Sequence, residues 1–273
     1  MDNTESPIKY IDIHSHLHFD SYDEDREELL SRMNEEGVAT ISIGIDSSTS
    51  VEEVELSKNN DNVFTSIGIH PGDSSELFEN KREVFEELVR SEKVVSIGEC
   101  GFDYSHLGDN LEESKRLQEK NFEAQIAFAV EHNLPAMIHT RDAEEDTASF
   151  LESKKREYGD KLRGNVHFFT QSVDYAKRYL DIDFTISFTG VITFTQDYDE
   201  IVKFAPLEKI HGETDAPFVA PVPHRGKRNE PTYVISVYEQ IARIRGEEKE
   251  AVRRALVSNA VRDFNLKKDA PLS

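Results

Sequence analysis

The chain has 273 residues, and 37% of them are hydrophobic, which is enough to build the core of a single α/β barrel of about 250 residues. Its 54 acidic and 32 basic residues give a formal net charge of −22, which argues against a general nucleic-acid scaffold with a broad basic surface. The single cysteine excludes an intrachain disulfide. The sequence has no signal-peptide pattern and no apolar run of about 20 residues. Together with the single cysteine, these features favour a cytoplasmic protein that does not span a membrane.

Short apolar, β-branched runs alternate with longer charged stretches along the chain. Eight of these runs are predicted to be strands: 8–14, 39–45, 63–69, 94–99, 134–139, 165–169, 184–188 and 209–213. The stretches between them have helical spacing, as in the two sets Phe122, Ile126, Ala129, Val130 and Val234, Val237, Tyr238, Ile241. Strands that alternate with helices predict a parallel sheet. Eight such units predict a (β/α)₈ TIM barrel, with residues 1–273 as a single domain.

The longest irregular stretch, 215–231, follows the last predicted strand. In a barrel it would lie at the carboxyl ends of the strands, where binding loops occur. Its basic residues are Arg225, Lys227 and Arg228. This basic island is either a phosphate-binding group or a solvated loop. Arg141, after the fifth predicted strand, is a similar candidate, whereas Asn229 and Glu230 are expected to fix the loop by hydrogen bonds.

Histidines and carboxylates recur where predicted strands end. His14 and His16 form an H-x-H pair, and because side chains alternate along a strand, both should point to the same side. Asp12, on the same face, is expected to accept a hydrogen bond from a ring N–H. The same ligand types return at later strand ends, at Glu99, His139, His167 and Asp215. These six side chains should converge at one face, where divalent cations would compensate their burial.

The remaining histidines have weaker signals. His70, in the segment GIHPGD after the third predicted strand, has either a site role or a structural one. Five others have no comparable placement and are expected to be structural or surface residues: His18, His106, His132, His211 and His224. Cys100 follows Glu99 and should therefore point to the opposite side of its strand, into the core.

Eight segments of the chain resemble the TatD family of metal-dependent deoxyribonucleases. The most specific segment is ETDAPFVAPVPHRGKRNEP (213–231). The others are DIHSHLHF (12–19), GIHP (68–71), IGECGFDY (97–104), LPAMIHTRDA (134–143), NVHFFTQS (165–172), ISFTGVITF (186–194) and SNAVRDF (258–264). They follow the order of the family over about residues 8–266. Two departures, Gln171 in place of a small residue and Cys100 in place of an apolar one, leave all the expected ligands present.

The resemblance implies a hydrolase with two divalent ions bridged by Glu99. His14, His16 and Asp215 would hold one ion, and His139 and His167 the other. This mixed ligand set admits Zn²⁺, Mg²⁺ or Mn²⁺. Two such ions activate a water and hold the oxygens of a phosphodiester, with Asp215 acting either as general base or only as a ligand.

The implied substrate is DNA, as single strands or ends, cleaved by a monomer or by an oligomer of unspecified size. Its binding residues would be His70, Arg141, Arg225 and Arg228. The acidic net charge does not exclude this activity, because the ions and a few local cations can hold the phosphate.

Two other functions remain open. A deacylase or amidohydrolase, acting on an ester or amide bond, would use the same barrel and metal site. Binuclear amidohydrolases commonly bridge their ions with a carboxylated lysine on the fourth strand, where this chain has Glu99, and this difference favours the nuclease. The second alternative is a homologue that binds metal only for structure. The presence of all six predicted ligands argues against this hypothesis.

Overall fold

Eight parallel strands form one sheet in chain order in the computed structural model, which describes residues 8–73, 76–105, 107 and 110–266. The strands are Tyr10–Ser15 (β1), Val38–Ile43 (β2), Val63–Ile67 (β3), Val94–Asp103 (β4), Ala136–Arg141 (β5), Gly164–Val166 (β6), Thr185–Phe188 (β7) and Ile210–Gly212 (β8). Each strand pairs with the next in parallel. Every predicted strand overlaps an observed one, so the predicted TIM barrel is confirmed.

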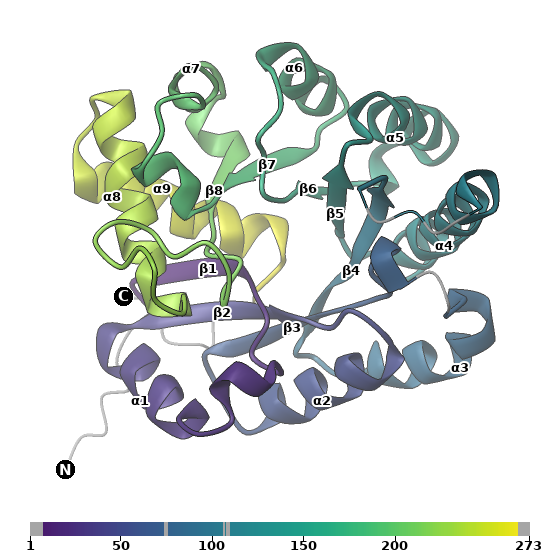
Figure 1. The fold of residues 1–273 in the computed structure, drawn as a ribbon, viewed down its shortest axis with the longest axis horizontal. Coiled ribbons are helices and arrows are strands. Elements are labelled where there is room, and N and C mark those ends of the chain that lie inside the picture. The colour runs from purple at the N-terminus through teal and green to yellow at the C-terminus, as the bar shows by residue number, and fades with distance from the viewer. Residues whose placement is uncertain (1–7, 74–75, 106, 108–109, 267–273) are drawn as a thin grey trace.

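Helices alternate with the strands and surround the sheet (Figure 1). The α-helices of the described residues are Arg26–Glu36 (α1), Ser47–Lys58 (α2), Phe78–Leu88 (α3), Leu111–Glu131 (α4), Glu144–Tyr158 (α5), Val173–Asp181 (α6), Asp199–Phe204 (α7), Val234–Arg245 (α8) and Lys249–Asp263 (α9). Both helical faces predicted from spacing lie against the core: Phe122, Ile126 and Ala129 are buried in α4, and the four predicted residues of α8 are buried as well. None of the helices in the described residues is both long and apolar enough to cross a membrane.

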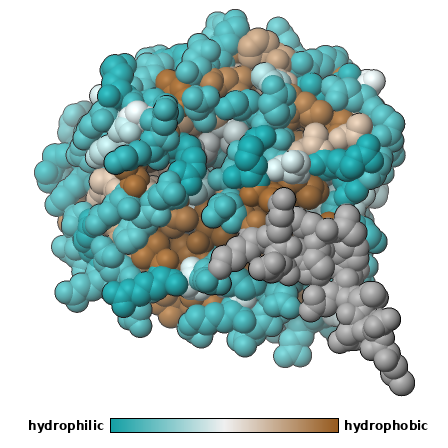
Figure 2. Space-filling model, turned by 180° about the vertical axis from the view of Figure 1, so that it is seen from behind, coloured by the Kyte–Doolittle hydropathy of each residue, from teal (hydrophilic) through white to brown (hydrophobic). Residues whose placement is uncertain are grey.

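Two apolar clusters hold the barrel together. The larger one packs strand residues such as Val63 and Ile138 against helix residues such as Phe122 and Ile241. The smaller one joins β1 and β2 to Phe264, which directly follows α9. Cys100 is fully buried in the larger cluster, as predicted. On the face shown in Figure 2, hydrophilic side chains surround smaller hydrophobic areas, in keeping with the charged composition.

Residues 214–216, which follow β8, close the barrel against β1, and we call this contact the seam. The Asp215 N–H donates to the His14 carbonyl over 2.9 Å, and the His16 N–H donates to the Ala216 carbonyl over 2.8 Å. The Asp12 carboxylate accepts from the Thr214 backbone N–H at 2.8 Å and from the Thr214 hydroxyl at 2.6 Å. The prediction that Asp12 accepts a ring N–H is therefore wrong, because its oxygens bind the seam instead.

The predicted irregular stretch 215–231 is a loop that runs from the seam to a short 3-10 helix, Pro231–Tyr233. Asn229 Nδ2 donates to the carbonyls of Thr214 at 2.9 Å and Phe218 at 2.6 Å. Glu230 accepts from Arg32 at 2.9 Å. The prediction that Asn229 and Glu230 fix this loop by hydrogen bonds is confirmed.

Candidate metal centre

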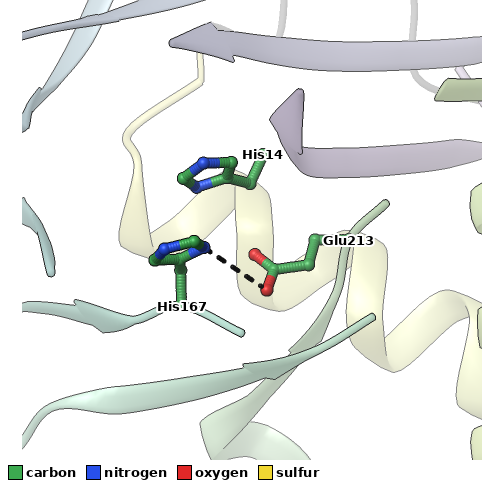
Figure 3. Close-up of side chains that lie close together, drawn as sticks. All are labelled: His14, His167 and Glu213. Atoms are coloured by element: carbon green, nitrogen blue, oxygen red, sulfur yellow. Dashed lines mark ion pairs between the residues drawn. The ribbon is translucent and has the colours of Figure 1, made fainter. Parts of the chain in front are cut away.

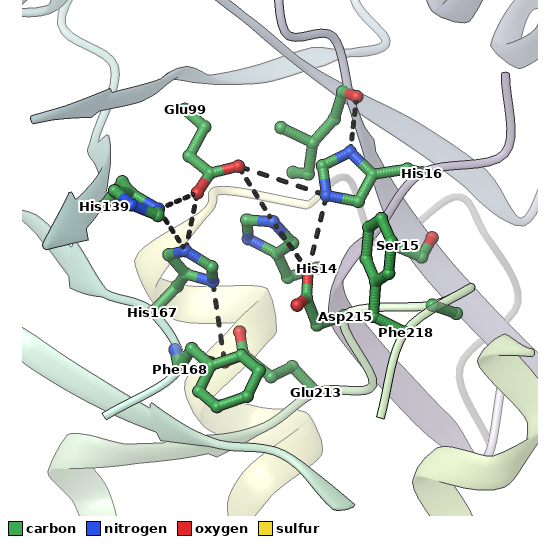
Figure 4. A network of polar contacts seen from close by, with 12 residues as sticks. His14, Ser15, His16, Glu99, His139, His167, Phe168, Glu213, Asp215 and Phe218 are labelled. Atoms are coloured by element: carbon green, nitrogen blue, oxygen red, sulfur yellow. Dashed lines mark hydrogen bonds and ion pairs between the residues drawn. The ribbon is translucent and has the colours of Figure 1, made fainter. Parts of the chain in front are cut away.

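The side chains predicted as metal ligands come together at the carboxyl ends of the strands (Figure 4). They come from β1 and the residue after it, from β4, from β5, from the residue after β6 and from the seam: His14, His16, Glu99, His139, His167 and Asp215. All six are buried or nearly so.

Glu99 lies at the centre of this group. Its Oε1 is 2.6 Å from His139 Nδ1 and 2.6 Å from His167 Nε2. Its Oε2 faces the other pair, 3.4 Å from His14 Nε2 and 4.0 Å from His16 Nε2. One carboxylate thus presents a different oxygen to each of two imidazole pairs.

Asp215 completes one side of the group. Its Oδ1 is 3.4 Å from His16 Nε2 and 3.7 Å from His14 Nε2. The fold determines this placement, because the seam bonds on both sides of Asp215 hold its backbone against β1.

Several buried ring nitrogens of the group lack hydrogen-bond partners in the described structure. They are Nδ1 and Nε2 of His14 and Nδ1 of His167. A buried polar atom without a partner costs about 1–3 kcal/mol. Two of the sets of three possible ligand atoms that lie within 4.8 Å of one another contain Glu99, one with His14 and His16 and the other with His139 and His167. The residues therefore fit divalent cations, which bind imidazole and carboxylate ligands.

The electrostatics of this group of side chains also fit a cation. Burial acts to raise the pKa of Glu99, but the imidazoles around it, His167 foremost, hold that pKa well below its usual value. For Asp215 burial is likewise outweighed, mainly by the hydrogen bond with His16, so its pKa is lowered. Both carboxylates are thus anionic at neutral pH. Burial lowers the pKa of His14 to about 4, so its ring is neutral and can act as a ligand.

Two buried carboxylates outside the predicted set lie next to the predicted ligands. Asp103 Oδ2, at the end of β4, is 3.4 Å from His139 Nε2. Burial opposes protonation of His139, yet hydrogen bonds with Asp103 and Glu99 raise its pKa to about 9. Glu213 Oε1 is 3.9 Å from His167 Nδ1, and Figure 3 shows it beside His167 and His14. A carboxylate beside the second nitrogen of a ligating imidazole orients the ring.

The positions of Asp103 and Glu213 in the sequence could have predicted that both lie on the same face as the predicted ligands. Asp103 is four residues after Glu99 and Glu213 is two before Asp215, so each has the even spacing of residues that share one face of a strand.

Two further histidines border the group. His70, whose role the sequence left open, has Nε2 3.7 Å from Glu99 Oε1, and its ring centroid is 4.4 Å from that of His139. His18 was expected to have no special placement, but its ring is 5.9 Å from that of His16. Its Nδ1 is hydrogen-bonded at 2.9 Å to Glu53, which is fully buried.

The other histidines lie elsewhere. His132 faces Glu86, His211 faces Asp263, and His224 stacks on Tyr233, whereas His106 lies outside the described residues.

The basic residues proposed to bind substrate differ in their partners. Arg228 forms two 2.6 Å hydrogen bonds with Asp25 and lies over the Tyr22 ring, so its charge is already compensated. Arg225 is exposed, donates to the Ala220 carbonyl at 3.1 Å and lies over Phe194. Arg141 is exposed at the end of β5. Of the three, only Arg228 pairs with a carboxylate within the described residues.

A cavity of about 430 Å³ lies at the other end of the barrel. Its lining includes Gly164 at the start of β6, Thr185 at the start of β7 and Phe264 after α9. The histidine and carboxylate group is therefore separate from this cavity.

The barrel, with histidines and carboxylates gathered at its carboxyl face, is that of a metal-dependent hydrolase of the TIM-barrel class. The chain belongs to the TatD family, since the family model described as "TatD related DNase" matches residues 11–265. This match confirms the resemblance seen in the sequence motifs.

Relatives with known sequences cover nearly the whole chain. It is 39% identical over 258 residues to the uncharacterized metal-dependent hydrolase YabD of Bacillus subtilis, covering 93% of this chain and 98% of YabD. It is 32% identical over 265 residues to a protein of Pantoea ananatis named 3′-5′ ssDNA/RNA exonuclease TatD, covering 93% and 99%. Among solved structures, the TatD homologue YJJV of Escherichia coli superposes with a TM-score of 0.84 at 25% identity, over 94% of this chain and 98% of YJJV.

Proposed function

We propose that this hydrolase is a deoxyribonuclease that removes nucleotides from DNA ends with two divalent ions, Zn²⁺, Mg²⁺ or Mn²⁺. The observation that carries the proposal is the position of Glu99, whose two oxygens face two separate imidazole pairs. The relative named as a single-stranded DNA and RNA exonuclease supports the choice of substrate.

His14, His16 and Asp215 would hold one ion, His139 and His167 the other, and Glu99 both. Bound ions of this kind lower the pKa of a water and neutralise charge on a phosphodiester. Asp103 and Glu213 keep the rings of His139 and His167 oriented through their second nitrogens.

Asp215 is the proposed general base. Its Oδ1 faces His16 and His14. Its Oδ2 makes no hydrogen bond to the described residues, which leaves this atom to accept the proton of an attacking water. The lowered pKa of Asp215 keeps the carboxylate unprotonated and able to accept. Of the cationic side chains, Arg225 and Arg141 are the better candidates for phosphate contacts, because Arg228 already binds Asp25.

The test compares two substrates on metal-loaded protein: 3′-labelled single-stranded DNA and an aminoacyl ester. We expect release of labelled nucleotides that stops with a strong chelator and returns when a divalent ion is added back. Hydrolysis of the ester without cleavage of DNA would replace the proposal with a deacylase. Full activity in a sample verified as metal-free would refute the metal centre itself.

A further inference from the structure

Exposed apolar side chains gather on the loops beside the metal centre. Among the described residues six large hydrophobic side chains are exposed, and three of them lie on the segments that follow β7 and β8. They are Phe194 (43% exposed), Phe218 (49%) and Val222 (47%). In a chain with 32% charged residues, this concentration at one end of the barrel calls for a ligand with apolar faces.

Phe218 lies next to the proposed ligands and packs against the Phe19 ring. It follows Asp215 by three residues, and its ring centroid is 6.3 Å from that of His16 (Figure 4). The Phe19 ring meets it edge to face, at 5.6 Å and 80°. The Phe218 N–H donates to the Asp215 carbonyl at 2.9 Å, and its carbonyl accepts from Asn229 at 2.6 Å. A side chain packed in this way loses little conformational entropy when a ligand stacks on it.

A second flat surface is built from the same two loops. The Arg225 guanidinium lies 3.9 Å from the centre of the Phe194 ring. The loops are tied together by the Val222 N–H, which donates to the Thr193 hydroxyl at 2.9 Å. A guanidinium stacked on an aromatic ring presents a planar cation that can stack on a base or contact a phosphate.

We propose that Phe218, backed by Phe19, stacks on a nucleobase of the substrate, and that the Phe194–Arg225 pair holds a neighbouring nucleotide. This inference rests on the proposed function and narrows its substrate to strands with unpaired bases, because pairing and stacking in a duplex hide the faces of the bases. A net charge of −22 disfavours the phosphate backbone. Stacking supplies affinity that depends on neither charge nor base sequence.

The test is a cycle that changes Phe218 and the substrate in turn. Phe218→Leu keeps an apolar side chain but removes the aromatic face, and Phe218→Trp enlarges it. On single-stranded DNA we expect Phe218→Leu to raise KM about tenfold with little change in kcat, because one base–aromatic stacking contact is lost. Phe218→Trp should retain the wild-type KM. On an oligonucleotide whose terminal nucleotides lack bases, wild type and Phe218→Leu should have the same KM.

The matched control is Phe204→Leu. Phe204 is similarly exposed, at 41%, but lies at the end of α7 beneath Lys177 rather than on the loops after β7 and β8. It should leave KM unchanged. Metal content is measured on every variant, because the Phe218 ring lies next to His16.

Binding of an oligonucleotide with terminal 2-aminopurine gives a readout independent of turnover. Its fluorescence should be quenched by wild type and less so by Phe218→Leu. An unchanged KM and unchanged quenching in Phe218→Leu would refute the stacking role, as would an equal loss on the oligonucleotide without terminal bases. If the wild type quenches 2-aminopurine but cleaves no DNA, the proposed function fails while the stacking surface stands.

Discussion

Replacing Glu99 by glutamine tests the centre of the site with the smallest change of shape. Glutamine keeps the size of the side chain and one acceptor oxygen but removes the charge. Glu99 is 3% exposed and lies within 4.0 Å of imidazole nitrogens of five histidines, namely His14, His16, His70, His139 and His167. The charge is therefore removed from the point that both proposed ions share.

The size of the effect follows from this geometry. Two unit charges about 4 Å apart interact by about 4 kcal/mol at the effective dielectric constant of about 20 that suits protein sites. A loss of about 4 kcal/mol corresponds to about a thousandfold weaker binding of an ion. Because Glu99 faces both imidazole pairs, the variant should lose at least one ion and nearly all hydrolysis. The fold should remain, since glutamine keeps the size of the side chain and the apolar clusters of the core are unchanged.

The assay measures metal stoichiometry, melting temperature and nuclease rate on the same preparation. Glu53→Gln is the control, because Glu53 is also a fully buried carboxylate beside a histidine but is not one of the six proposed ligands. As a comparison, His16→Ala should weaken mainly one ion and His167→Ala mainly the other. Two retained ions with near-normal turnover in Glu99→Gln would refute the bridging role. A large loss of stability with intact metal content would make Glu99 a structural carboxylate.

Four further variants test the surroundings. Asp103→Asn should weaken metal binding about 10- to 100-fold without unfolding the barrel, because the His139 ring loses its orienting carboxylate; titration calorimetry measures this, and unchanged affinity would contradict it. Burial raises the pKa of Glu213 to about 7, so its contribution to stability is present at low pH and lost as the pH rises through 7. Glu213→Gln should therefore raise the melting temperature of metal-free protein more at pH 8 than at pH 5, and an equal shift at both would count against a buried ionisation. Arg225→Ala should raise KM for DNA more than it lowers kcat. Arg228→Ala should instead cost about 0.5–1 kcal/mol of folding stability through its lost pair with Asp25; kinetics and thermal unfolding of both variants separate the two roles.

The barrel and the convergence of the six predicted ligand side chains could be predicted from the sequence because their signals are local. Apolar runs and helical spacing depend on neighbours a few residues apart, and the strand ends then bring His14, Glu99 and His139 to one face without further information. The main error in the strands is at β4, predicted as 94–99 but observed to Asp103. Its last residues continue to pair with β5, from Cys100 opposite Ile138 to Asp103 opposite Arg141. A strand predicted to end at Glu99 does not include Asp103, so Asp103 is absent from the residues predicted for the site.

The contacts that were missed join residues far apart in the chain. Arg228 pairs with Asp25 across 203 positions, and His18 pairs with Glu53 across 35. No periodicity encodes such pairs, because each depends on how two separate elements pack. The sequence therefore does not show that the charge of Arg228 is compensated by Asp25 in the folded chain.

Because Asp215 lies in the seam, an ion held by the proposed ligands would also stabilise the closed barrel. β8 has only three residues, and the ring of strands is completed by backbone bonds around Asp215, one of the proposed ligands. An ion bound between Asp215 and the histidines His14 and His16 would connect the two sides of the seam. Its binding free energy would add to the stability of the closed barrel. We expect chelation to speed exchange of the Asp215 and His16 amide protons while leaving those in the middle of β3 protected. Loss of metal would then register first as a local opening of the barrel, before any global unfolding.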